Sequence, residues 1–147
     1  MKKCWAIEHS PCNGEISREH YISKSIFEQQ FIYVTGLNWC KGKEKKISIA
    51  NLTSKVLCEY HNNQLSVVDS AGINAIRIFE QFFPKQYRSV KTEPENKVVD
   101  GLNFERWLLK TAINLTYKGD MHLGVGMTDS IPGIPSPYLS LFNVLKY

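Results

Sequence analysis

The stretch Leu57-Cys58-Glu59-Tyr60-His61-Asn62-Asn63 places two metal-binding side chains one helical turn apart, directly before a pair of asparagines. With two residues between them, Cys58 and His61 can bind one ion from a single turn. Upstream, Cys4 and Cys12 offer a second pair, although their spacing is wider than in most zinc knuckles. We expect these three sulfurs and one imidazole nitrogen to form a tetrahedral structural zinc site.

Alternatives to this zinc site stay open at the level of sequence. The same residues are compatible with buried thiols and a hydrogen-bonded core histidine, and Cys40 is a rival for either place of the first pair. A disulfide framework is not expected, because Met1-Lys2-Lys3 is followed by no apolar core of a secretory signal. We therefore expect a cytoplasmic protein, in which thiols stay reduced and metal binding is the main use for four cysteines.

The composition of the 147-residue chain predicts one compact domain, alone or with an extension. Its hydrophobic share of 43% is ordinary for a globular protein, and its apolar runs are too short to span a bilayer, so we expect no membrane partner. The net charge of +4 is a mild excess that is compatible with a polyanion. Four lysines concentrate it in one short segment, which is either a phosphate-binding segment or a solvated loop: Lys41, Lys43, Lys45 and Lys46.

Hydrophobic periodicity predicts a mixture of strands and helices. Alternation favours strands over residues 16–22 and 46–52, and helical spacing favours helices over 25–34, 62–83 and 103–117. Pro84 should end the second helix, and Asn103 is the expected N-cap of the third. A polar connection over 85–100 marks a plausible boundary. The fold class is therefore expected to be α+β.

The segment Glu19-His20-Tyr21-Ile22-Ser23-Lys24-Ser25, followed by residues 57–63 and preceded by the first cysteine pair, resembles the motif of the HNH endonucleases. These are ββα-metal nucleases in which a zinc knuckle braces the active site. The resemblance covers roughly residues 1–84. It implies a small zinc-stapled ββα-metal core over 1–84, followed by a mainly helical C-terminal extension of unknown role over 85–147.

The resemblance also assigns roles to residues. His20 would be the general base that activates water, while Glu19 and Asn62 would hold one catalytic divalent cation, Mg²⁺ or another, with Asn63 as the fallback for Asn62. Counting back from Asn62 to the middle position of the motif gives Thr53, whereas the nearby asparagine is Asn51; we assign the position to Asn51 and leave Thr53 open. Taken singly, Glu19-His20 could also be a solvent-facing strand pair and Asn62 a helix cap.

By the same resemblance the protein would be a metal-dependent endonuclease that hydrolyses phosphodiester bonds in double-stranded DNA. Arg18 and Lys24 flank His20 and would bind phosphates together with the four lysines of the basic segment. The C-terminal region would serve a homodimer or a partner protein. Two other readings stay open: a zinc-stabilised nucleic-acid-binding module without catalytic activity, and a small zinc-stapled interaction domain.

Overall fold

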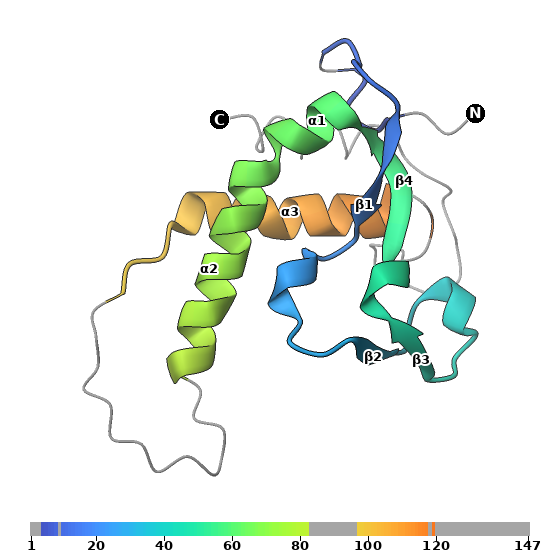
Figure 1. The fold of residues 1–147 in the computed structure, drawn as a ribbon, viewed down its shortest axis with the longest axis vertical. Coiled ribbons are helices and arrows are strands. Elements are labelled where there is room, and N and C mark those ends of the chain that lie inside the picture. Colours follow the sequence, from blue (N-terminus) through green and yellow to red (C-terminus); the bar gives the residue numbers. More distant parts are fainter. Residues whose placement is uncertain (1–3, 9, 83–96, 118, 120–147) are drawn as a thin grey trace, which may run out of the picture.

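The computed structural model describes residues 4–8, 10–82, 97–117 and 119 (Figure 1). Within these residues the chain forms a small mixed α/β fold with two short antiparallel sheets. Its elements follow in the order β1 (Ile16–His20), 3₁₀-helix η1 (Lys24–Ile26), β2 (Phe31–Val34), η2 (Asn38–Cys40), β3 (Lys45–Ser48), η3 (Ile49–Asn51), β4 (Thr53–Cys58), α1 (Glu59–Gln64), α2 (Ser66–Phe82) and α3 (Gly101–Tyr117).

The first sheet pairs β1 with β4 and leads directly into α1. Ile16 lies opposite Cys58 and His20 opposite Thr53, and the register shifts between these two ends of the ladder. This confirms the strand expected over residues 16–22. Because Cys58 is both the last residue of β4 and the residue that precedes α1, the sheet delivers this thiol to the start of the helix.

The second sheet replaces most of the helix expected over residues 25–34, and that prediction is wrong. The only helical element in this range is the short 3₁₀-helix η1. Strand β2 follows it and pairs with β3, with Val34 opposite Lys45. Phe31, Ile32 and Tyr33 are residue types that favour a pleated surface once a partner strand is present, and local spacing cannot reveal that partner. The strand expected over 46–52 is confirmed in its first part by β3, while η3 forms the rest.

The helix expected over residues 62–83 is present but divided. It begins earlier, at Glu59, and Leu65 separates α1 from α2, which ends at Phe82. Leu65 packs its side chain into the core, and its N–H still reaches the carbonyls of His61 and Asn62 at 3.3 and 3.2 Å. Pro84, the expected end of this helix, lies outside the described residues.

Helix α3 confirms the prediction over residues 103–117 and extends it to Gly101, but its cap differs from the expected one. Asp100, not Asn103, is the capping side chain: its Oδ1 accepts from the backbone N–H of Asn103 at 3.1 Å. The predicted cap lies inside the first turn instead. A carboxylate three residues upstream reaches a free N–H of the first turn, which a side chain within that turn cannot do as well.

Helix α3 packs into the same core as β4 and α2, and Figure 1 shows it crossing behind α2 and β1. The indole N–H of Trp5 donates to Asn114 of α3 at 3.0 Å, which links the N-terminal segment to this helix. The extension assigned to residues 85–147 thus contributes core residues, while its boundary at residue 84 lies outside the described residues. The core comprises Cys4, Trp5, Ala6, Val56, Leu57, Cys58, Leu65, Val68, Trp107 and Ile113.

The close approach of α2 and α3 depends on Gly72. A Cβ placed on this glycine would lie 2.2 Å from Cγ of Trp107, far inside van der Waals contact. The indole of Trp107 also stacks on Phe104, with 5.9 Å between ring centroids. Gly72 therefore costs some helix propensity but lets the two helices pack with a tryptophan between them.

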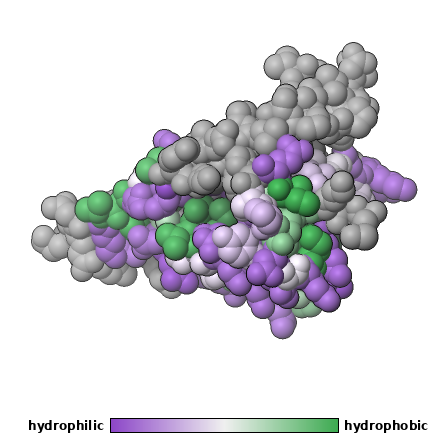
Figure 2. All heavy atoms as spheres, turned by 90° about the horizontal axis from the view of Figure 1, so that it is seen from above, coloured by the Kyte–Doolittle hydropathy of each residue, from purple (hydrophilic) through white to green (hydrophobic). Residues whose placement is uncertain are grey.

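Exposed hydrophobic side chains are mostly scattered. On the face drawn in Figure 2, hydrophobic residues lie interspersed with hydrophilic ones. Isolated apolar side chains of this kind are normal on a protein surface. The exception is β2, where two aromatic rings stand two residues apart: Phe31 is 48% exposed and Tyr33 is 65% exposed.

Candidate metal centre and the neighbouring polar cluster

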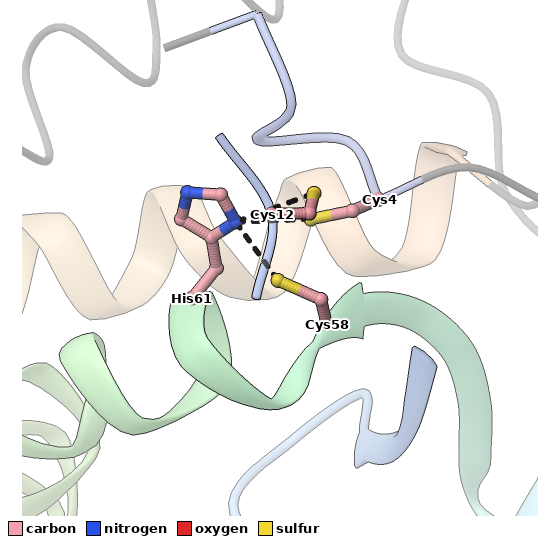
Figure 3. Close-up of side chains that lie close together, drawn as sticks. All are labelled: Cys4, Cys12, Cys58 and His61. Atoms are coloured by element: carbon pink, nitrogen blue, oxygen red, sulfur yellow. Dashed lines mark hydrogen bonds between the residues drawn. The ribbon is translucent and has the colours of Figure 1, made fainter. Parts of the chain in front are cut away.

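The four expected zinc ligands come together in the structure. The ligand atoms of Cys4, Cys12, Cys58 and His61 all lie within 4.8 Å of one another. Figure 3 shows the three sulfurs grouped on one side of the His61 ring, around its Nδ1 atom. That nitrogen lies 3.1 Å from the sulfur of Cys58, 3.3 Å from that of Cys4 and 3.9 Å from that of Cys12.

These distances fit a bound ion. Tetrahedral zinc with bonds of about 2.3 Å to sulfur and about 2.0 Å to nitrogen separates a sulfur from a nitrogen ligand by about 3.5 Å. The measured separations, from 3.1 to 3.9 Å, bracket that value. A small shift of each side chain would therefore complete the tetrahedron. The Cys3His cluster could hold a metal such as zinc.

The loop that carries Cys12 is fastened to the start of α1 by backbone hydrogen bonds. Gly14 turns the chain with a φ of 80°, a conformation that glycine adopts readily. The carbonyls of Asn13 and Glu15 then accept from the N–H groups of Tyr60 and Glu59 at 3.2 and 2.9 Å. Because these N–H groups belong to the first turn of a helix, they have no partner within it. The loop therefore caps α1 and brings Cys12 to the cluster.

Ser10 orients the ring of His61. Its hydroxyl lies 2.7 Å from Nε2, the ring nitrogen on the side away from the sulfurs. A metal-binding histidine typically donates its second N–H to an oxygen, which fixes the tautomer and aims the other nitrogen at the ion. With Ser10 accepting from Nε2, the lone pair of Nδ1 faces the three cysteines. Sequence reasoning missed Ser10, since nothing in its spacing distinguishes it from any loop serine.

The pKa values of the clustered thiols show that a bound cation would help them to ionise. Burial raises the pKa of Cys4. Burial and the neighbouring Cys58 and Cys4 raise the pKa of Cys12 to about 12. Burial also acts to raise the pKa of Cys58, but hydrogen bonds from the backbone of His61 and Asn13 and from the thiols of Cys12 and Cys4 together hold that pKa below its ordinary value. One thiolate is thus favoured, and a divalent ion would supply the charge needed to form the others.

Cys40 is not part of this cluster, which settles the rivalry left open by the sequence. It lies in η2, fully buried, and its thiol donates to the carbonyl of Val34 at 3.5 Å. All four cysteines are free thiols in the structure.

A second cluster joins two helices and one strand around a buried ammonium. Nζ of Lys110, on α3, lies 2.7 Å from the carboxylate of Glu19 on β1 and 2.6 Å from that of Asp69 on α2. Lys110 and Glu19 are nearly buried, with side chains 2% and 10% exposed, whereas Asp69 is 25% exposed. When all three groups are ionised, one negative charge is left over.

Hydroxyl and indole groups extend this cluster. Ser23 donates to the other oxygen of Asp69 at 2.8 Å and accepts from the indole N–H of Trp107 at 2.9 Å. Asn62 makes a side-chain hydrogen bond to Glu19, and its amide donates to Ser17 at 3.4 Å. The expected pair Glu19 and Asn62 is thus in contact.

The pKa of Glu19 reflects these neighbours. Burial raises it above the ordinary value, while the charge of Lys110 and its hydrogen bond, together with Asn62, act to lower it. Together, Glu19, Asp69 and Asn62 offer carboxylate and amide oxygens, the ligand type that magnesium prefers. These residues have the ligand atoms that a divalent cation needs, but one carboxylate oxygen of Glu19 already forms an ion pair with the Lys110 ammonium.

His20 has a different set of neighbours. Burial and the positive charge of Lys24 lower its pKa, and a backbone hydrogen bond to Ile49 opposes them. Among the residues that the structure describes, Nε2 of His20 has no hydrogen-bond partner although it is buried, and the same holds for the hydroxyl of Ser54. Successive residues of a strand point to opposite faces, so Glu19 and His20 reach different surroundings.

Most of the remaining predicted site residues are exposed and lie outside the two clusters. Asn51 is exposed at the end of η3, whereas Thr53 pairs with His20 across the first sheet. Asn63 is exposed, one residue beyond Asn62. All six predicted phosphate-binding residues are exposed as well: Arg18 on β1, Lys24 in η1, and Lys41, Lys43, Lys45 and Lys46 around the start of β3.

Sequence reasoning missed two members of the second cluster. No sequence motif assigns a site role to Asp69 or Lys110. A lysine among apolar residues at helical spacing was the available signal, because a buried ammonium requires acidic partners.

Comparisons with protein-family models, with curated proteins and with solved structures find no match. The resemblance to HNH endonucleases therefore stands on the motif residues themselves. No helix among the described residues has the length and apolar character needed to cross a membrane. The apolar segment near the C-terminus, expected to mediate a homodimer or a partner contact, lies outside the described residues.

Proposed function

We propose that this protein is a metal-dependent endonuclease of the HNH type that hydrolyses phosphodiester bonds in DNA. The order of its elements supports the proposal, because two antiparallel strands run into a short helix at a junction braced by the Cys3His cluster. The observation that carries it is Nε2 of His20, a buried nitrogen without a partner among the described residues. Buried polar atoms without partners are rare and often mark functional positions.

In this proposal His20 is the general base. Its pKa is lowered by burial and by Lys24, so the neutral imidazole dominates near neutral pH. The hydrogen bond to Ile49 falls to Nδ1, because Nε2 has no partner. This leaves the lone pair of Nε2 free to accept a proton from water. Since Nε2 is buried, that water would have to enter together with the substrate.

Glu19 and Asn62 would hold the divalent cation, and Asp69 adds a second carboxylate nearby. When bound, the cation neutralises charge that develops on the phosphate and on the departing oxygen. The surplus negative charge of the cluster favours a cation there. Lys110 holds the carboxylate of Glu19 in place, and Thr53, opposite His20 on β4, is better placed than the exposed Asn51 to brace the histidine.

The ion pair between Lys110 and Glu19 favours one alternative, a zinc-stabilised nucleic-acid-binding module without catalytic activity. An ammonium that permanently occupies the carboxylate would compete with a divalent ion for it. In that case the lysines of the basic segment would still bind phosphates and the Cys3His cluster would still brace the fold, while Glu19 and Asn62 would hold no divalent cation.

Plasmid cleavage tests the proposal. The zinc-loaded full chain should nick or cut supercoiled DNA in the presence of magnesium, and removal of magnesium should stop the reaction. His20→Ala should abolish cleavage, by a factor of about 100 or more for loss of a general base, and should leave DNA binding unchanged.

Asn62→Ala and Asn63→Ala form a matched pair of variants. Both remove one amide from α1, but only Asn62 contacts Glu19. We expect cleavage to fall in the first and to persist in the second. Absence of cleavage of any DNA or RNA with magnesium, manganese or nickel, or full activity of His20→Ala, would refute the nuclease and leave the binding module.

A further inference from the structure

The exposed face of the hairpin formed by β2 and β3 carries two aromatic rings. Phe31 and Tyr33 stand two residues apart on β2, so both rings project from the same face, whereas Ile32 and Val34 between and after them are half-buried. The separation along the strand is about 7 Å. Figure 1 shows this hairpin at the opposite end of the molecule from α1. It is therefore distinct from the Cys3His cluster.

Lys46 lies directly beside these two rings, and Lys45 lies beside a third ring, that of Trp39. Nζ of Lys46 is 5.3 Å from the ring centroid of Phe31 and 5.9 Å from that of Tyr33, with which Lys46 pairs across the sheet. Lys45 lies 5.5 Å from the ring of Trp39 and donates to its carbonyl at 2.8 Å. These ammonium groups are held over π faces by the hairpin itself.

The charge of the hairpin is strongly one-sided. Lys41 and Lys43 in the preceding turn are exposed like Lys45 and Lys46, and Glu44 is the single acid in the segment 41–46. A surface that combines exposed aromatic faces with a line of cations complements a polyanion whose bases are free to stack. Duplex DNA fits the cations but not the rings, because its bases already stack on one another.

We propose that the aromatic platform made by Phe31, Tyr33 and Lys46 binds unpaired bases of a single-stranded nucleic acid, with Lys41 and Lys43 of the preceding turn on its phosphates. The inference rests on the proposed function only in taking nucleic acid as the partner class. It specifies a substrate with a single-stranded stretch. Binding at the platform needs neither the divalent cation nor His20, so it can be measured separately from cleavage.

Fluorescence anisotropy of a labelled oligothymidine, without added magnesium, tests the platform. Tyr33→Ala and Phe31→Ala should each weaken binding by about tenfold, since stacking contributes roughly that much per base. Tyr33→Phe keeps the π face and should stay within about twofold of the wild type. Leu108→Ala removes a hydrophobic side chain of similar exposure, 47% against 48% for Phe31, and should have no effect.

Binding to a duplex of the same length distinguishes contacts with bases from contacts with phosphates. The alanine variants at Phe31 and Tyr33 should leave duplex binding unchanged, whereas Lys46→Ala should weaken both. Equal affinity of the ring variants and the wild type for the single strand would overturn the platform. A molecular mass that rises with concentration in the wild type, but not in Tyr33→Ala, would also overturn it and would assign the face to a second copy of this chain. Loss of plasmid cleavage alone would count only against the nuclease.

Discussion

Lys110 is the residue on which the second cluster depends, and Lys110→Met is the sharpest test of that cluster. Methionine keeps the length of the aliphatic stem and its packing but removes the charge. Two carboxylates, one of them almost buried, would then face a thioether in place of an ammonium. We expect a large loss of stability, because a buried charge without a partner is much more costly than a buried ion pair.

The magnitude follows from burial and distance. The ammonium lies 2.7 Å from Glu19 and 2.6 Å from Asp69, and the side chain of Glu19 is only 10% exposed. Removing one partner of a fully buried pair costs about 3–5 kcal/mol. Asp69 contributes less to this loss of stability, since its side chain is 25% exposed and also accepts a hydrogen bond from the hydroxyl of Ser23. We therefore expect the free energy of unfolding to fall by about 2–4 kcal/mol.

Chemical denaturation of the zinc-loaded protein measures this loss. Lys55→Met on β4 is the matched control, because Lys55 is exposed and its replacement should change stability by less than about 0.5 kcal/mol. Adding Glu19→Gln to Lys110→Met removes the unpaired charge and should restore part of the stability. The double variant would thus be more stable than the sum of the single effects predicts.

The loss should also depend on pH in a defined direction. Burial raises the pKa of Glu19 above 4.5 in the folded protein, and removal of Lys110 raises it further. A carboxyl whose pKa is higher in the folded state binds more protons when folded, so acid stabilises the variant relative to the wild type. The difference between the two proteins should therefore shrink as the pH falls from about 7 through the raised pKa of Glu19.

Two results would refute this reasoning. A Lys110→Met protein as stable as the Lys55→Met control would mean that the ammonium does not neutralise Glu19 and Asp69 in solution. A stability difference that stays constant, or grows, as the pH falls would mean that Glu19 is not the group left unpaired.

Two further predictions concern the metal and the helix packing. The purified protein should carry zinc in stoichiometric amount by metal analysis; Cys58→Ser should lose most of it and Cys40→Ser should keep it, and equal zinc contents in the two variants would contradict the ligand assignment. Gly72→Ala should lower the free energy of unfolding by about 1–3 kcal/mol, because a Cβ 2.2 Å from Trp107 outweighs a gain of about 1 kcal/mol in helix propensity. Gly101→Ala, whose Cβ meets nothing within 4 Å, should be neutral or stabilising, so equal thermal shifts of the two variants would argue against close packing at Gly72.

The ligands of the metal centre were accessible to sequence reasoning because their chemistry is local. Cys58 and His61 are one helical turn apart, and a thiol pair elsewhere in a short chain has few other uses. What spacing could not decide was the choice between Cys12 and Cys40. That choice depends on the loop after Cys12, whose carbonyls cap the start of α1 and carry the thiol to the cluster.

The second sheet shows where local patterns fail. Residues 25–34 have apolar positions compatible with a helix, yet β2 forms because β3, more than ten residues later, supplies the pairing. As a result, Phe31 and Tyr33 belong to a strand instead of the expected helix, and both stand exposed beside Lys46. The aromatic platform proposed above could therefore not be predicted from the sequence.

The sequence by itself predicted the α+β class, two of the three α-helices of the described residues within a few residues, and the metal-binding pair Cys58 and His61. Each of these depends on side chains that lie within one turn or one strand of each other, or on a residue chemistry with few partners. Tertiary structure alone decided that Lys110 meets Glu19 and Asp69 and that Gly72 receives Trp107. Those contacts join residues dozens of positions apart, and only the packing of α3 against β1 and α2 brings them within reach.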